Sequence, residues 1–440
     1  MVYSKSFFQS VSIPPLIVCA SLTFVLPIDF VALSPFWRSV STLSLIVGSA
    51  LATLVLLASN LKMLKAVGLG AIALVMLNQF FLFNPVALLT IAGPLLIGMA
   101  TAYVMRGHLL FVMASASVVN AVLLAWEYSV KKHVVSYFFG VPFQESASEE
   151  LFRARGFLGQ PVPASMVAVA LCFAVLSFKS ESRNGVAAAK YATLCATVVT
   201  LLVTGTRSAA LILIVGCFLL ALSRPQYRRI KVPTTLAVVG PLLLAVLVAC
   251  LGQVIDLLSG MRIASFETLS GSSSLDNRVH ALDVFEYWSE NCNGSCVIFG
   301  SGARSLLLEL SNSLGILGFS TVDNLYMSIL WDFGLIGLMS ISVLLVLAAR
   351  RLRRSDGYSA ASAGSIIVIL TLASGLLYDS LYIRSALFVF GFGLALIGIL
   401  PPVKVVEQNL SEQSGEMAGA AESRRFVGSR MVSSGEKEGI

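Results

Sequence analysis

Long apolar segments alternate with short polar connections along most of this chain of 440 residues. A helix that crosses a bilayer needs about 20 predominantly apolar residues, and roughly twelve such runs precede residue 403. The predicted spans are 13–33, 40–59, 66–83, 85–105, 109–127, 162–178, 187–204, 208–222, 233–252, 324–348, 363–381 and 385–402. The pattern therefore predicts an all-α polytopic membrane protein with about twelve transmembrane helices.

The composition excludes a water-soluble globular protein. Hydrophobic residues make up 57% of the chain and charged residues 12%, and the mean hydropathy is +0.88. A soluble domain carries about 25% charged residues, so this chain lacks the polar surface that water requires. The net charge of +7 does not indicate nucleic-acid binding, because the Lys and Arg residues occur in small groups between apolar runs.

The basic groups predict the orientation of the chain. Clusters at 224–231 and 350–354 lie in connections on the same predicted side of the membrane. Since cytoplasmic loops are enriched in Lys and Arg, both termini are expected in the cytoplasm of a bacterial inner membrane. Two long connections, about 128–161 and 253–323, then lie on the periplasmic side. Residues 1–403 form a single transmembrane domain, and residues 404–440, rich in Ser, Gly and Glu, are expected to be a disordered cytoplasmic tail.

The second long connection contains a short periodic segment. In DNRVHALDVFEYW, apolar residues recur at three-residue spacing from Val279 to Trp288. This spacing suits an amphipathic helix at 279–288 that lies on the bilayer face, with its Trp and Tyr at headgroup level. The segment ARSLLLELSNSLGILG is a second, weaker candidate for such a helix.

Cys292 and Cys296 lie close together in the polar stretch ENCNGSC, on the predicted periplasmic side. A disulfide here would close a small loop around a turn-forming Asn-Gly-Ser sequence. Two unpaired thiols are the alternative.

A first candidate for chemistry is Arg207, in the segment VTGTRSAALILIVG at 203–216. It occupies a connection of only a few residues between two predicted spans. An arginine there either extends to the membrane interface or binds an anion at the membrane boundary. Positive charge is disfavoured in short outer loops, so its presence calls for a reason.

Three further candidates lie in the second long connection or directly after it. Arg278 precedes the predicted surface helix, and its planar guanidinium group suits either a phosphate or an ion pair with Asp276 or Asp283. Asp323 and Asn324 stand at the start of the predicted span 324–348. Helix capping explains one of them, whereas a carboxylate beside guanidinium groups would be a candidate general base.

The sequence has no signature of a soluble enzyme and no metal-ligand spacing. The motifs GxxxxGK[ST], HExxH and GxSxG are absent, and the three His residues are far apart. We therefore expect no metal and no cofactor.

These motifs together resemble a known family. The order TGTRSAALI, NRVHALDVFEYW with IFGSGARS, and DNLYMSILWDFGLIGL is similar to the C-terminal core of the O-antigen ligase and Wzy-type polysaccharide polymerase superfamily. Gly334 and Gly337 follow Asn324 at the spacing of the family. The stretch RARGFLGQPVPAS, with Arg155, also resembles the family's loop before the middle spans. The resemblance covers roughly 150–345.

The resemblance implies a membrane glycosyltransferase of the GT-C kind that acts on undecaprenyl-diphosphate-linked sugars at the periplasmic face, without metal or nucleotide sugar. Ligases of the family typically carry His where this chain has Asp323, and the polymerase branch often has Asp-Asn. This departure favours polymerisation of oligosaccharide repeat units into O-antigen, capsule or exopolysaccharide. The alternative within the family is an O-antigen ligase.

In this interpretation Arg207 and Arg278 hold the lipid diphosphate, and Asp323 orients or deprotonates the acceptor hydroxyl. Asn324, Arg155 and Arg304 are the expected substrate-binding residues. The expected partners are the polyprenyl-diphosphate oligosaccharide and membrane lipids, with a chain-length regulator as a further candidate and no nucleic acid.

A lipid-linked sugar flippase or transporter is the alternative from another functional class. A transporter is expected to carry ionisable residues near the middle of its spans, and the apolar runs hold almost none. Lys190 and Glu127 lie near enough to span ends to keep this alternative open.

Overall fold

The structure is a computed structural model, and every regular element among its described residues is a helix. The described residues are 14–23, 34–59, 85–133, 152–178, 184–223, 284–311, 324–354 and 359–399. Within these ranges the prediction of an all-α protein is confirmed.

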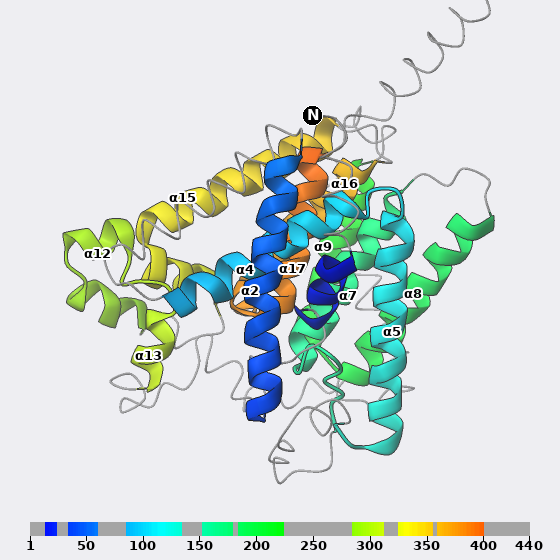
Figure 1. Cartoon of the computed structure of the whole chain (residues 1–440), viewed down its shortest axis with the longest axis horizontal. Helices are drawn as coiled ribbons and strands as arrows, with labels where there is room; N and C mark the ends of the chain where they lie inside the picture. The colour runs from blue at the N-terminus through cyan, green and yellow to red at the C-terminus, as the bar shows by residue number, and fades with distance from the viewer. Residues whose placement is uncertain are drawn as a thin grey trace, which may run out of the picture. The chain divides into compact units, whose positions relative to one another are not determined.

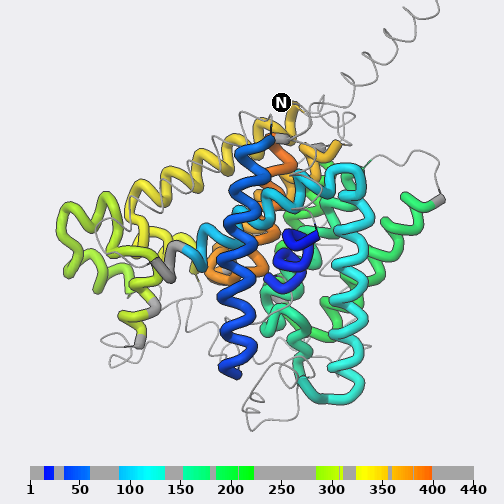
Figure 2. Tube along the Cα trace, in the orientation of Figure 1, coloured from blue at the N-terminus to red at the C-terminus, as the bar shows by residue number. Residues whose placement is uncertain are grey.

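Nine long helices and three short ones are named below, residues 14–23 and 284–291 are also helical, and Figures 1 and 2 show the arrangement. The long helices are α2 (Pro35–Ala58), α4 (Pro85–Val104), α5 (Leu109–Val130), α7 (Pro161–Leu176), α8 (Asn184–Thr204), α9 (Arg207–Ser223), α15 (Leu325–Arg354), α16 (Ala360–Ser374) and α17 (Arg384–Ile399). The short ones are α12 (Gly294–Phe299), α13 (Ser305–Ser311) and the 3-10 helix η3 (Ser380–Tyr382).

Four of these helices, α2, α5, α8 and α15, are long and apolar enough to cross a membrane. Six shorter apolar helices accompany them, including α7, α16 and α17. This supports a polytopic membrane protein, and twelve spans remain a prediction. The predicted spans 66–83 and 233–252 and the tail 404–440 lie outside the described residues, as do large parts of both long connections.

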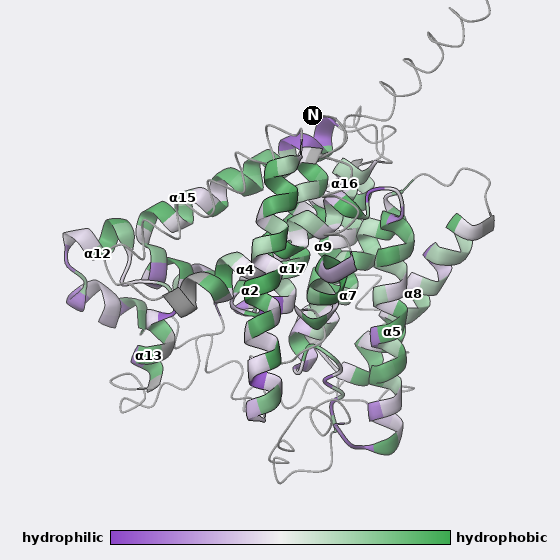
Figure 3. Cartoon of the chain, in the orientation of Figure 1, coloured by the Kyte–Doolittle hydropathy of each residue, from purple (hydrophilic) through white to green (hydrophobic). Residues whose placement is uncertain are grey.

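The long helices differ in how much of their apolar surface is covered. Nearly every residue of α7 and of α16 is buried. By contrast, α2, α5, α8 and α15 carry large apolar side chains that are exposed. Figure 3 shows that hydrophobic residues make up most of these helices. Examples are Phe36, Leu54, Val122, Tyr191 and Met339. Extended apolar faces on long helices suit a hydrocarbon environment, so α7 and α16 form the protein interior and the other four helices suit contact with lipid.

Small residues allow the central helices to approach closely. A Cβ atom on Gly98 of α4 would lie 2.1 Å from the carbonyl oxygen of Phe388 in α17. A Cβ atom on Gly391 of α17 would lie 2.2 Å from the carbonyl oxygen of Leu95. Backbone contact at glycine is a common way to pack helices in membranes, where water does not drive association.

Helix α15 is broken near its start. Gly334 has φ 62° and ψ −159°, which is not helical, and the helix continues beyond it to Arg354. Helices α12 and α13 contact the first part of α15 (Figures 1 and 2).

Two predicted elements differ from the observed ones. The predicted span 363–381 ends as α16 at Ser374, because residues 375–383 form turns and η3. In the described part of the predicted surface helix, residues 284–291 are helical. Val284 and Trp288 are 0% and 5% exposed in a cluster with Leu306, Met327 and Trp331. Protein therefore covers the Trp288 side chain, and its level relative to the lipid headgroups stays a prediction.

Hydrogen bonds join several helix ends on one side of the bundle. The Leu325 amide at the start of α15 donates to the Gly375 carbonyl just after α16, at 2.8 Å. The Arg384 guanidinium at the start of α17 donates to Ser41 near the start of α2, at 3.1 Å. We call this side the polar end. It comprises the loop 152–160, the connection 205–206 with the first residue of α9, the start of α15, the connection 375–383, and residues 300–306, which we call the loop 300–306 although its last two residues begin α13.

Candidate functional site

Asn324 caps the N-terminus of α15. Its side-chain oxygen accepts from the backbone N–H groups of Tyr326 and Met327, at 3.0 and 3.2 Å. These amides have no partner within the helix, so the cap supplies acceptors that the helix lacks. The capping role predicted from the sequence is confirmed for Asn324.

The loop 300–306 packs against the break in α15. The N–H of Ser301 donates to the carbonyl of Trp331 at 2.7 Å, and the N–H of Gly302 donates to the carbonyl of Asp332 at 3.0 Å. These carbonyls lie just before Gly334, where the helix is interrupted. Buried backbone groups need partners inside the protein, and this loop provides them.

Glycines make this contact sterically feasible. Gly300 has φ +80°, and a Cβ atom on it would lie 2.3 Å from the backbone of Asp332. Gly334 has φ +62°, and its Cβ atom would lie 2.5 Å from the carbonyl oxygen of Ile298. Both positions need glycine for conformation and for space. The Gly-x-Gly sequence of the loop and the first glycine of the α15 motif thus form two sides of one contact.

The carboxylate of Asp332 lies at the centre of this contact and is 0% exposed. Its Oδ2 accepts from the Arg304 N–H at 2.5 Å and from the Tyr382 hydroxyl at 2.5 Å. Its Oδ1 accepts from the Ser305 hydroxyl at 3.0 Å and from the Leu306 N–H at 3.1 Å. A buried carboxylate requires this kind of compensation, and four donors supply it.

Tyr382 connects Asp332 with the rest of the polar end. Its hydroxyl also contacts the Ser328 carbonyl at 3.1 Å, and its own carbonyl accepts from Nη2 of Arg304 at 3.3 Å. The Ser328 hydroxyl donates to Asp379 at 2.6 Å. We call the set Arg304, Asn324, Ser328, Asp332, Asp379 and Tyr382 the α15 network.

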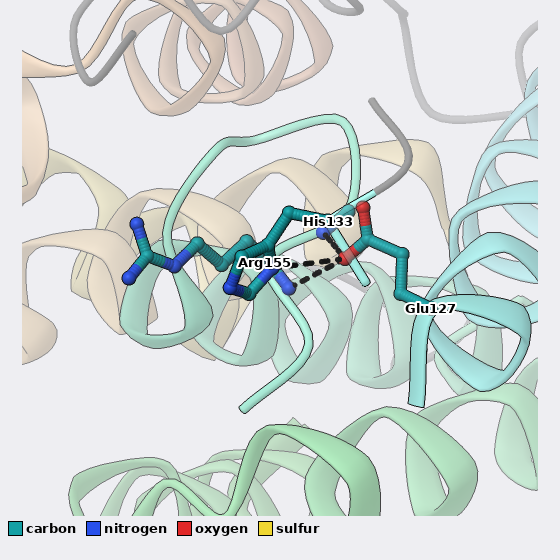
Figure 4. Close-up of polar contacts among 4 residues, drawn as sticks. Glu127, His133 and Arg155 are labelled. Atoms are coloured by element: carbon teal, nitrogen blue, oxygen red, sulfur yellow. Dashed lines mark hydrogen bonds and ion pairs between the residues drawn. The ribbon is translucent and has the colours of Figure 1, made fainter. Parts of the chain in front are cut away.

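A second carboxylate holds the loop 152–160. Glu127, in the last turn of α5, is 0% exposed, and its Oε2 accepts from the N–H groups of Arg155 and Gly156 at 2.8 and 2.9 Å (Figure 4). Nδ1 of His133 lies 3.9 Å from the same oxygen. An acidic group at a helix C-terminus is disfavoured by the helix dipole, and the two amides offset this cost. Figure 4 shows the guanidinium group of Arg155 pointing away from Glu127.

Arg155 carries its positive charge in a half-buried position. Partial burial lowers the pKa of its guanidinium group, and the negative charge of Glu127 opposes this shift. An arginine remains protonated in proteins at neutral pH, so Arg155 is a half-buried positive charge. Such a charge interacts more strongly with an anion than one in bulk water.

The loop 152–160 is also attached to the connection before Arg207. Nε of Arg153 donates to the Thr204 carbonyl at 2.9 Å, and its Nη2 donates to the Thr206 hydroxyl at 3.1 Å. Arg207 follows directly as the first residue of α9. On its other side the loop contacts the connection 375–383, because the Tyr378 hydroxyl donates to Gln160.

The structure thus places four of the six predicted site residues at the polar end: Arg155, Arg207, Arg304 and Asn324. Arg278 and Asp323 lie outside the described residues. The two-residue connection from Thr204 to Arg207 confirms the short turn that the sequence predicted. Glu127 and Lys190 both make contacts near helix ends, since Nζ of Lys190 donates to the Phe178 carbonyl.

Sequence reasoning missed Asp332, Tyr382 and Asp379. An ionisable residue inside an apolar span is itself a signal, and Asp332 stands in the middle of SILWDFGL. Its partners were not predictable, because two of the four are backbone amides of residues 304 and 306.

Cys292 and Cys296 form a disulfide with a Cα–Cα distance of 5.4 Å. Both contact the cluster around Trp288, so the disulfide stabilises the segment between helix 284–291 and α12. Among the residues that the structure describes, no group of three or more His, Cys, Asp or Glu side chains could hold a metal ion.

Comparison with known proteins identifies one domain. Residues 192–342 match the family model described as O-antigen ligase. No curated protein matches the chain. The matched segment contains α9, the loop 300–306 and the start and break of α15. Residues 192–342 are therefore similar to an O-antigen ligase domain, in agreement with the resemblance of the motifs in this segment.

Proposed function

We propose that this protein is a membrane glycosyltransferase that polymerises oligosaccharide repeat units carried on undecaprenyl diphosphate, at the periplasmic face of the bacterial inner membrane. The observation that carries the proposal is that the family domain, 192–342, contains much of the polar end. Asp323 at the position where ligases typically carry His favours the polymerase over the ligase.

In the proposed reaction, the bond between the anomeric carbon of the donor sugar and the diphosphate oxygen breaks. A hydroxyl oxygen of the acceptor repeat unit forms the new bond to that carbon. The hydroxyl proton passes to the carboxylate of Asp323, and the lipid diphosphate leaves with the electron pair of the broken bond. General-base assistance of this kind contributes about 10²–10⁴-fold to the rate.

Arginine side chains are the proposed partners of the leaving group. Arg207 and Arg278 contact the diphosphate, and Arg155 and Arg304 contribute to substrate binding together with Asn324. Guanidinium groups match phosphate oxygens bidentately. At the membrane boundary their charge is weakly screened, so the loss of one such donor costs about 2.7–4 kcal/mol of transition-state stabilisation.

The described contacts favour an enzyme over a transporter. Glu127 and Lys190, which lie near span ends, contact neighbouring loops or helix ends. Asp332, within α15, contacts the loop 300–306 and Tyr382. A transport pathway calls for ionisable groups that line a route through the membrane, whereas these groups fix the structure at its ends.

The carrier-linked glycans of cells that lack the protein test the function. Accumulation of one repeat unit on the carrier supports the polymerase. Accumulation of full-length polymer on the carrier indicates a ligase, and absence of any periplasmic repeat unit indicates a flippase. Wild-type protein should restore polymer, whereas Arg207→Ala and Arg278→Ala should abolish it while the protein stays in the membrane. Wild-type chain lengths in both variants would contradict the proposed mechanism.

A further inference from the structure

The carboxylate of Asp332 has no role in the proposed reaction, yet it is among the most thoroughly bonded side chains of the polar end. It is 0% exposed and accepts four hydrogen bonds from residues 304, 305, 306 and 382. Three of these donors belong to one loop, so the carboxylate fixes the path of that loop relative to α15.

The donors are divided evenly between the two oxygens. Oδ2 faces the Arg304 N–H and the Tyr382 hydroxyl, and Oδ1 faces the Leu306 N–H and the Ser305 hydroxyl. A hydroxyl can rotate and become an acceptor, but a backbone N–H cannot. Both oxygens therefore have to act as acceptors, as they do in an ionised carboxylate.

The backbone of the loop is held in an uncommon conformation. Arg304 has φ +62°, as a non-glycine residue, between Gly302 at φ +104° and the start of α13. Side-chain-bearing residues adopt this region rarely and keep it only when the surroundings determine it. The bond from the Arg304 N–H to Asp332 is one such constraint, because it fixes the peptide that sets this φ angle.

The side chain of Arg304 is fixed at its other end by the same network. Its Nη2 donates to the Tyr382 carbonyl at 3.3 Å, and the Tyr382 hydroxyl donates to Asp332 at 2.5 Å. Asp332 thus bonds directly to the backbone of Arg304 and is linked to its guanidinium group through Tyr382.

We propose that Asp332 is a positioning residue that, together with Tyr382, holds the guanidinium group of Arg304 in place to bind the anionic lipid diphosphate of the donor. The inference rests on the proposed function for the identity of the ligand. In this proposal Asp332 does not contact the substrate. It affects catalysis only through the position of Arg304.

Asp332→Asn is the sharpest test, because it preserves shape and removes one acceptor. In either orientation the amide places an NH₂ group against a backbone N–H, of Arg304 or of Leu306. The loop is then displaced, and a displacement of about 1 Å in a binding group can cost about 100-fold in rate. We expect about this loss in a reconstituted polymerisation assay with a lipid-linked repeat unit, together with a higher KM for the donor. Glu286→Gln, on an exposed position of helix 284–291, is the matched control and should behave as wild type.

A double-mutant cycle separates positioning from general damage. If Asp332 acts through Arg304, the pair Asp332→Asn with Arg304→Ala should lose no more activity than the more impaired single variant. If the two losses multiply, the positioning role is wrong. Tyr382→Phe is a milder second variant: it keeps the carboxylate and removes one donor, so it should raise the KM for the donor less than Asp332→Asn does.

A readout independent of activity distinguishes this inference from the proposed function. Ala303 is 5% exposed. A cysteine introduced by Ala303→Cys should resist maleimide labelling in the parent protein and react when Asp332→Asn is added, with the labelled site assigned by mass spectrometry. Unchanged labelling would overturn the positioning role. If instead labelling rises but the parent protein forms no polymer, the proposed function fails and the positioning of the loop stands.

Discussion

The loops 152–160 and 300–306 are both held in place by a buried carboxylate, but the two carboxylates bond differently. Each carries an arginine at the polar end, and in each a buried carboxylate accepts the backbone N–H of that arginine. Glu127 holds Arg155, and Asp332 holds Arg304. In both cases the carboxylate therefore fixes the backbone at the arginine directly.

The two anchors differ in which oxygens hold the backbone of the loop. Both N–H groups of the loop 152–160 bond to one oxygen of Glu127, Oε2, whereas the N–H groups of Arg304 and Leu306 bond to different oxygens of Asp332. Glu127 also lies in a regular helix, whereas Asp332 lies two residues before a helix break that the loop itself covers. The loop 300–306 and α15 are therefore mutually dependent, whereas the loop 152–160 rests on an element that is complete without it.

The largest effect is expected where the loop and the break meet. Gly300→Ala places a Cβ atom 2.3 Å from the backbone of Asp332 at a residue with φ +80°. The conformational strain alone costs about 1–3 kcal/mol, and the steric overlap displaces the loop further. We expect loss of polymer and a lower thermal unfolding temperature in detergent. Gly294→Ala is the control, because nothing lies within 4 Å of the added atom. Equal behaviour of the two variants would contradict the described contact.

A smaller effect is expected from Glu127→Gln. The amide oxygen of glutamine can take the position of Oε2 and accept both N–H groups, so these two bonds are kept while the charge is lost. Compared by polymer yield at equal amounts of membrane protein, Glu127→Gln should retain more activity than Asp332→Asn. The reverse order would show that the charge at residue 127 matters more than whether one or two oxygens hold the loop N–H groups.

The smallest effect is expected from removal of the disulfide. Cys292 and Cys296 are four residues apart, and the stabilisation from closing so small a loop is at most about 2 kcal/mol. The double substitution of both residues by Ser should lower the unfolding temperature slightly and leave polymer length unchanged. The side chain of Asn293 still accepts from the backbone of residue 296 and holds the turn. Loss of polymer would mean that the loop 300–306 depends on this segment more than its own bonds indicate.

Local features of this protein were predictable from its sequence, because each depends on neighbouring residues. The apolar runs indicated the spans, Asn324 indicated the start of α15, and the spacing of Cys292 and Cys296 allowed the disulfide. The end of α16 at Ser374 was not predicted, since apolar residues continue beyond the point where the helix stops.

The bonds that Asp332 and Glu127 make could not be predicted from the sequence, for a different reason. Asp332 bonds to backbone amides 26 and 28 positions away, and Glu127 to amides 28 and 29 positions away. Backbone amides leave no mark in a sequence, so an acidic residue in an apolar run indicates that a partner exists without indicating which one.

The most direct test of the central claim is whether the purified protein forms glycosidic bonds from a lipid-linked repeat unit. Proteoliposomes that contain the protein and a single oligosaccharide unit on polyprenyl diphosphate should yield chains of several units. One polyprenyl diphosphate should be released for each bond formed. Movement of the intact lipid-linked unit across the bilayer, with no bond formed and no carrier released, would contradict the account.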